Sequence, residues 1–124
     1  MRLSIFGTGY VGLVTGTCFA EMGNTVLCVD IDERKIDALK QGEMPIFEPG
    51  LSDMVSSNHR RGTLEFTTDA ARAVETADVI FIAVGTPEDE DGSADLSYVL
   101  NVADTIGQNM SAEKVIVDLS LIHI

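Results

Sequence analysis

The stretch Ile5-Phe6-Gly7-Thr8-Gly9-Tyr10-Val11-Gly12 decides the fold of this chain. The apolar residues before the glycines predict a buried strand, and the residues after them predict a helix. The glycines stand at the G-x-G-x-x-G spacing of a strand–turn–helix unit that binds dinucleotides. In such a unit Gly7 permits the tight turn, Gly9 leaves room for a pyrophosphate, and Gly12 lets the helix pack closely.

A second strand followed by an acidic residue completes this pattern. The run Thr25-Val26-Leu27-Cys28-Val29 is β-branched and apolar, and Asp30 follows it 18 residues after Gly12. An acid at about this spacing accepts hydrogen bonds from the adenosine ribose hydroxyls. The alternative is that Asp30 caps the next helix, a role that Asp32 also fits. Because a carboxylate at Asp30 repels a 2′-phosphate, the pattern favours NAD over NADP.

The rest of the chain alternates between strand and helix patterns. The run 79–84 is apolar throughout, as a central parallel strand buried on both faces requires. The alternation predicts right-handed crossovers and a doubly wound parallel α/β sheet, in one domain over residues 1–118. The predicted strands cover about 2–6, 25–30, 64–67, 79–84 and 115–118, and the predicted helices about 10–22, 33–41, 51–59, 69–75 and 96–110.

Ligands of such sheets bind beyond the carboxyl ends of the strands. Gly85 and Thr86 follow the strand predicted at 79–84, which we expect beside the first strand. Their backbone and the Thr86 hydroxyl are therefore candidates to line the cofactor site, although a plain strand-ending turn is the alternative. Tyr10 either closes over the cofactor or belongs to the core. The acidic loop 88–91 is interpreted as a solvated surface and not as a metal site.

Composition and charge exclude several classes of function. The 124 residues are 45% hydrophobic and 23% charged, which is ordinary for a globular domain. A net charge of −12 argues against nucleic acid or an anionic membrane as partner. No apolar run approaches the about 18 residues of a membrane-spanning helix. Because the first strand begins by residue 3, we expect no signal peptide.

The cysteines and histidines do not form a recognisable metal or disulfide pattern. Cys18 and Cys28 lack C-x-x-C spacing and are predicted to be buried free thiols, which places the protein in the reducing cytoplasm. His59 and His123 are far apart and lack the spacing of zinc ligands, so no metal site is predicted.

Five motifs, taken in order, resemble the amino-terminal domain of the UDP-glucose/GDP-mannose dehydrogenase family. The resemblance covers residues 1–118, and within the family it is strongest to the bacterial members that oxidise UDP-glucose. The Glu-Pro-Gly-Leu and Gly-Thr-Pro elements are far more specific than the glycine motif. The five motifs are Phe6-Gly7-Thr8-Gly9-Tyr10-Val11-Gly12, Val29-Asp30-Ile31-Asp32 with Lys35-Ile36, Pro45-Ile46-Phe47-Glu48-Pro49-Gly50-Leu51, Val84-Gly85-Thr86-Pro87 and Ala94-Asp95-Leu96-Ser97-Tyr98.

The resemblance implies an NAD-dependent, two-step oxidation of a nucleotide-sugar 6-hydroxyl to a carboxylate by a homo-oligomeric full-length enzyme. It also implies that the Pro45–Gly50 loop packs near the site. By matching position, the residues implied to contact NAD are Gly7, Gly9, Tyr10 and Val11 at the pyrophosphate, Asp30 and Lys35 at the adenosine ribose, and Thr86 beside the cofactor.

The catalytic residues of the family lie beyond the part that this chain matches. Cys18 and Cys28 do not match the motif of the family's nucleophilic cysteine, so no catalytic residue is predicted here. After the fifth strand the family runs Lys-Ser-Thr-Val-Pro, whereas residues 119–124 read Leu-Ser-Leu-Ile-His-Ile. That string is the translated end of a common transposase-based sequencing adapter, so we predict a non-native tail on a truncated gene. A genuine apolar strand end is the alternative.

Other functions stay open at this point. The enzyme alternatives are a GDP-mannose or UDP-N-acetylsugar dehydrogenase, and a β-hydroxyacid dehydrogenase, against which the Glu48–Gly50 loop counts. The alternative from another class is a non-catalytic module that binds NAD.

Overall fold

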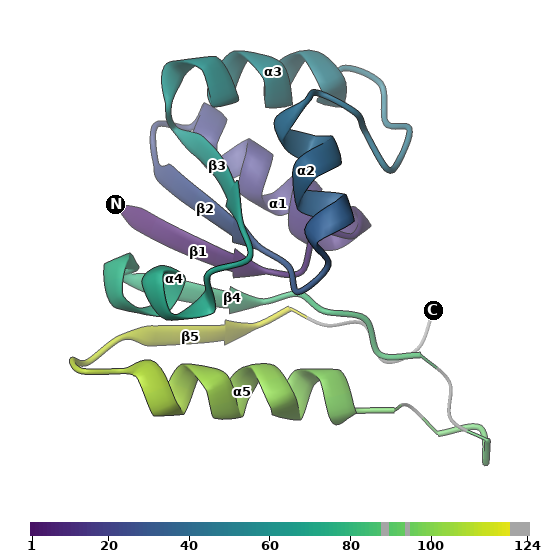
Figure 1. Cartoon of the computed structure of the whole chain (residues 1–124), viewed down its shortest axis with the longest axis vertical. Coiled ribbons are helices and arrows are strands. Elements are labelled where there is room, and N and C mark those ends of the chain that lie inside the picture. Colours follow the sequence, from purple (N-terminus) through teal and green to yellow (C-terminus); the bar gives the residue numbers. More distant parts are fainter. Residues whose placement is uncertain (88–89, 94, 120–124) are drawn as a thin grey trace.

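The computed structural model describes residues 1–87, 90–93 and 95–119, and its centre is a parallel five-stranded sheet (Figure 1). The strands lie in the order β3-β2-β1-β4-β5. The strands are β1 (Arg2–Phe6), β2 (Thr25–Val29), β3 (Leu64–Thr67), β4 (Val79–Ile82) and β5 (Val115–Asp118). The helices are α1 (Tyr10–Glu21), α2 (Glu33–Lys40), α3 (Leu51–Arg61), α4 (Ala70–Thr76) and α5 (Ser97–Asn109).

This strand order confirms the predicted doubly wound topology. The chain first adds β2 and β3 on one side of β1 and then adds β4 and β5 on the other. The carboxyl ends of the three central strands stand level, because Phe6 pairs with both Val29 and Ile82. The strand order therefore reverses beside β1, and a ligand crevice is expected at that point.

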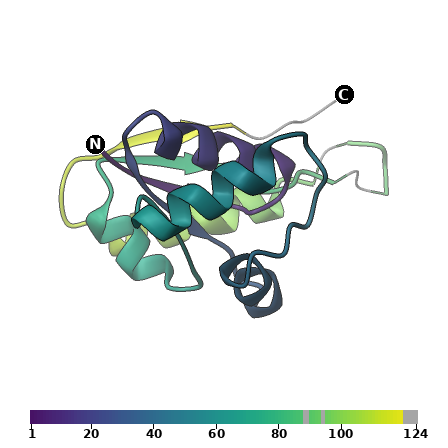
Figure 2. The same ribbon diagram turned by 90° about the horizontal axis from the view of Figure 1, so that it is seen from above.

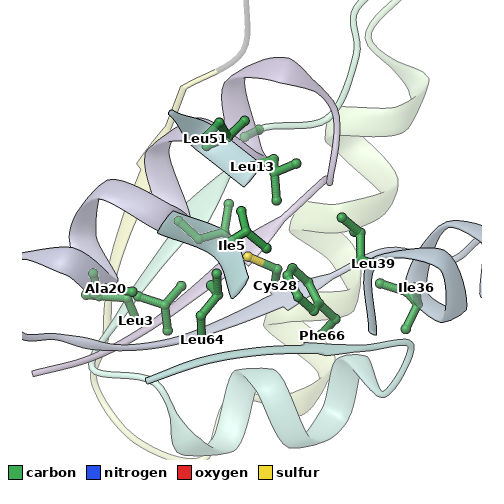
Figure 3. Packing of buried hydrophobic residues seen from close by; sticks show 13 residues of the cluster. Leu3, Ile5, Leu13, Ala20, Cys28, Ile36, Leu39, Leu51, Leu64 and Phe66 are labelled. Carbon is green, nitrogen blue, oxygen red and sulfur yellow. The ribbon is translucent and has the colours of Figure 1, made fainter. Parts of the chain in front are cut away.

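Two hydrophobic clusters cover the two faces of the sheet. One joins the strands to α1, α2 and α3, and Ile5, Leu13 and Cys28 lie at its centre (Figure 3). The other joins the opposite face to α4 and α5. On the first face α1 and α3 lie side by side (Figure 2). Ile36 and Leu39 are buried beneath α2, as the sequence pattern predicts.

The element boundaries differ from the predicted ones at two places. The strand predicted over 79–84 ends at Ile82, because its neighbours end there: Ile82 pairs with Phe6 on one side and Asp118 on the other. The helix predicted over 51–59 continues to Arg61 and ends at Gly62, whose φ of +77° suits a glycine C-cap. The other boundaries agree to within one or two residues.

The prediction for the cysteines is right for one and wrong for the other. Cys28 is fully buried, and burial raises the pKa of its thiol to about 12. Cys18 is exposed, because the buried stripe of α1 passes through Leu13, Thr17 and Ala20 and leaves position 18 on the outer face. Of the predicted non-native tail only Leu119 lies within the described residues, and its N–H donates to the Ile82 carbonyl at 2.8 Å.

Candidate functional site

The three glycines of the first loop meet different surroundings. Gly7 has a φ of +112°, and a Cβ there would lie 2.5 Å from the Ala83 carbonyl oxygen. A Cβ on Gly12 would lie 1.9 Å from the Gly7 carbonyl oxygen. Both glycines therefore let the loop, β4 and α1 approach closely. Gly9 has no atom within 4 Å of its Cβ position, so its missing side chain leaves open space beside the loop.

The first turn of α1 faces this open space without a cap. Gly9 is its N-cap residue and supplies no side-chain hydrogen bond, and the first turn contains no acidic residue. The N–H groups of Tyr10, Val11 and Gly12 have no acceptor within the helix. They combine with the positive end of the helix dipole, so the turn suits an anion such as a phosphate. The Val11 side chain packs against the core, which leaves its backbone for the ligand.

Asp30 follows β2 and turns its carboxylate toward the glycine loop. Its Oδ2 accepts from the Thr8 N–H at 3.2 Å and from the Thr8 hydroxyl at 2.7 Å. Its Oδ1 accepts from the Asp32 N–H at 3.0 Å. The cap of α2 is Asp32, which accepts from the Arg34 N–H at 2.9 Å, so the capping alternative for Asp30 is wrong. Sequence reasoning missed Thr8, a buried residue that no spacing rule marks.

Gly85 and Thr86 extend from the carboxyl end of β4, which lies beside β1 as predicted. Gly85 has open space at its Cβ position. The Thr86 hydroxyl oxygen is buried and has no hydrogen-bond partner among the described residues. Because buried hydroxyls are almost always bonded, this oxygen suits a polar group that a ligand supplies.

Tyr10 lies at the start of α1 and contacts the proline-containing loop between α2 and α3. It is 52% exposed, so it is not a core residue. Its hydroxyl donates to Glu48 Oε2 at 2.8 Å. This hydrogen bond to the carboxylate, with the adjacent negative charge, raises the pKa of the Tyr10 phenol. The loop therefore packs near the glycines, as the sequence resemblance implies.

Not every predicted site residue is brought into this group. Lys35 is exposed on α2, and its side chain makes no hydrogen bond or ion pair with the described residues. Ile31, which no prediction included, is 91% exposed directly after Asp30. Gly16 was missed as well: a Cβ there would lie 2.9 Å from Cys28 Sγ, so it holds α1 close to β2. A glycine inside a helix, costly without a packing reason, is the signal that marks it.

The residues present fit a dinucleotide. The space at Gly9 and the uncapped turn of α1 suit a pyrophosphate, Asp30 suits a ribose, and the unpartnered Thr86 hydroxyl offers a further polar contact. These features meet at the switch point of a doubly wound sheet, and together they define a dinucleotide-binding domain.

The chain belongs to the UDP-glucose/GDP-mannose dehydrogenase family, as its NAD-binding domain. The model of that domain matches residues 1–124. The UDP-glucose 6-dehydrogenase TuaD of Bacillus subtilis is 52% identical over 99% of this chain and 27% of its own length. The UDP-glucose 6-dehydrogenase of Rhizobium meliloti is 52% identical over 100% of this chain and 29% of its own length.

A solved structure shares the fold closely. The GDP-mannose dehydrogenase of Pseudomonas aeruginosa, solved as a ternary complex, superposes with a TM-score of 0.93 at 42% identity. The match covers 97% of this chain and 28% of that one. This chain therefore spans little more than a quarter of the length of the relatives that it matches.

The described residues carry neither a membrane-spanning helix nor a cluster of metal-binding side chains. Their helices include none whose length and apolar character would let it cross a membrane. Within the same ranges no group of His, Cys, Asp and Glu side chains is arranged to hold a metal ion. His123 and part of the acidic loop 88–91 lie outside the described residues.

Proposed function

We propose that this chain binds NAD as the amino-terminal part of a nucleotide-sugar 6-dehydrogenase that oxidises UDP-glucose to UDP-glucuronate with two NAD. The observation that carries the proposal is the Asp30 carboxylate, fixed by hydrogen bonds beside the glycine loop. UDP-glucose is preferred to GDP-mannose because two UDP-glucose enzymes are 52% identical over 99% and 100% of this chain, whereas a GDP-mannose enzyme is 46% identical over 86% of it.

We assign each group of the site a binding role. The N–H groups at the start of α1 hold the pyrophosphate, and Gly7 and Gly9 let it approach. Asp30 accepts from the ribose hydroxyls, and Lys35 supplies positive charge beside them. Gly85 and the Thr86 hydroxyl line the side facing β4. When bound, NAD supplies the hydride acceptor, and the residues of this chain bind and orient it.

We place the catalytic nucleophile and the sugar site in the part of the enzyme beyond this domain. The two thiols of this chain are unsuited to the task. Cys28 is buried with a pKa of about 12, so it is not a thiolate at neutral pH. Cys18 lies on the outer face of α1, in the last turn of the helix and away from its amino-terminal turn. The isolated chain is therefore expected to bind NAD without turnover.

Substitution of Asp30 tests the cofactor site. Asp30→Ala is expected to weaken NAD binding about tenfold or more, because it removes charge-assisted hydrogen bonds to the ribose. Calorimetric titration of the 124-residue chain measures the effect, and NADP should bind more weakly than NAD to the unchanged protein. Asp37→Ala, on the exposed face of α2, makes the same charge change and serves as control. Equal affinities for the two variants would refute the assignment.

The full-length gene tests the wider proposal, in which the parent enzyme is a cytoplasmic homo-oligomer. If the reading frame continues past codon 118 as Lys-Ser-Thr-Val-Pro into a second half with a cysteine, residues 119–124 are a non-native tail. The resulting enzyme should then oxidise UDP-glucose faster than GDP-mannose or UDP-N-acetylsugars. A frame that stops after Ile124 would instead leave a non-catalytic module that binds NAD.

A further inference from the structure

We infer that Glu48 is a positioning residue for the cofactor site, because its hydrogen bond to Tyr10 ties the loop of residues 43–50 to the phosphate-binding turn of α1. The inference rests on the proposed function and adds a residue to it. No part of the glycine motif requires an acid at this position.

The Tyr10–Glu48 hydrogen bond joins segments that are 38 positions apart in the sequence. It is the one side-chain hydrogen bond between the 43–50 loop and the rest of the chain that the described residues show. The start of the loop is held by the Glu43 N–H, which donates to the Ala38 carbonyl at 2.9 Å. At its other end Leu51 begins α3, with its N–H donating to the Glu48 carbonyl at 3.0 Å.

Between these ends the loop is only partly packed. Met44 and Ile46 contact the first hydrophobic cluster, whereas Phe47 is 90% exposed. Since Phe47 adds no burial, the Glu48 side chain supplies the polar contact between this part of the loop and α1. Without the Tyr10 hydroxyl, the loop of residues 43–50 would keep the backbone hydrogen bonds at its two ends and lose its side-chain hydrogen bond to α1.

The same contact fixes Tyr10, whose own N–H is one of the phosphate-binding donors. A rotating aromatic side chain in the first turn can cover the open space at Gly9, and the bond to Glu48 holds the ring toward the loop. Pre-ordering of this kind raises affinity because fewer groups lose freedom on binding.

A double-substitution cycle on the 124-residue chain tests the tie. Tyr10→Phe and Glu48→Ala are each expected to weaken NAD binding about two- to fivefold, the range for one exposed hydrogen bond. The double variant should be no weaker than either single one, since all three lose the same bond. Glu48→Gln keeps an acceptor and should stay within about twofold of the unchanged protein.

Matched controls and a spectroscopic measurement separate positioning from a merely structural role. Tyr98→Phe and Glu43→Ala change an exposed tyrosine and an exposed glutamate without touching the bond, and should leave NAD affinity unchanged. In tyrosine-labelled NMR, Glu48→Gln should lower the pKa of the Tyr10 phenol toward its ordinary value while Tyr98 does not move.

The outcomes distinguish this inference from the proposed function. If the unchanged protein does not bind NAD, the proposed function fails. If it binds NAD and responds to Asp30→Ala, but the Tyr10 and Glu48 effects are absent or simply add, the tie is overturned and the proposed function stands. Loss of thermal stability in the single variants with full NAD affinity would likewise overturn the positioning role.

Discussion

At the scale of single residues, the glycines of the first loop differ in whether the fold itself requires them. Gly7 and Gly12 are required by atoms of the chain itself, since a side chain at either would overlap backbone. No atom lies within 4 Å of the Cβ position of Gly9, so no contact among the described residues explains why this residue is a glycine. We therefore expect the ligand, and not the fold, to require glycine at position 9.

This difference predicts opposite outcomes for two alanine substitutions. Gly12→Ala should lower the free energy of unfolding by about 2–4 kcal/mol, because the new Cβ meets the Gly7 carbonyl at 1.9 Å. Gly9→Ala should change it by less than about 1 kcal/mol and still weaken NAD binding about tenfold or more. Denaturant unfolding and calorimetric titration measure the two effects. A Gly9→Ala protein that binds NAD normally would contradict the phosphate assignment.

The sequence marked the loop glycines and Asp30 as candidates because the pattern that they form depends on spacing along one βαβ unit. It did not identify Thr8 as the partner of Asp30, or Glu48 as the partner of Tyr10. These contacts cross 22 and 38 positions, and only the folded path of the chain brings them together. Local patterns carry no information about such pairs.

At the scale of elements, the predicted strands and helices were found, and their ends were set by neighbours. An apolar pattern continues past Ile82, yet β4 stops where its partners on both sides stop. The helix α3 passes its predicted end because Arg61 donates to Glu21 at 3.2 Å and to the Asn58 side-chain oxygen at 3.0 Å. Pairing partners and long-range contacts decide these boundaries, and a single sequence does not reveal them.

Asn58 is expected to contribute to the packing of α3 against α1, because it bonds to a residue at the end of α1. Its buried amide nitrogen donates to Glu21 Oε2 at 2.7 Å and to the Met54 carbonyl at 2.8 Å. Asn58→Ala should therefore lower the free energy of unfolding by about 2–3 kcal/mol, since it leaves partners unsatisfied. The control is Asn101→Ala on the exposed face of α5, which should be neutral or slightly stabilising. Equal effects in thermal melting would contradict a role for the network.

At the scale of the whole molecule, the topology was predictable because few arrangements satisfy right-handed crossovers. The exposure of individual apolar side chains was less predictable. Leu100 on α5 and Val115 on β5 are 64% and 58% exposed, although their pattern is that of buried positions. Apolar side chains exposed on an edge strand and on a helix are typical of surfaces that another part of a protein covers. The sequence marks them as apolar but not as uncovered.

Because Cys18 is exposed and Cys28 is buried, thiol labelling can measure the global unfolding of the molecule. With a thiol reagent at pH 8, Cys18 should react quickly and Cys28 only when the molecule unfolds, because its thiol is buried and its pKa is about 12. In a Cys18→Ser variant, NAD at a hundred times its dissociation constant should slow labelling of Cys28 about a hundredfold. NADP at the same concentration serves as the control. Fast labelling of Cys28 without NAD would show that the core opens locally.

Because the sheet is parallel, the amino ends of all five strands lie on one side of the molecule and their carboxyl ends on the other. The glycine loop, Asp30 and Thr86 follow carboxyl ends of strands, whereas Met1, 72% exposed, stands at the amino end of β1. A strand of this length separates the two by roughly 16 Å. A fluorophore or sensor surface attached at the amino terminus is therefore held away from the glycine loop. Affinities measured on immobilised protein should then match those measured in free solution.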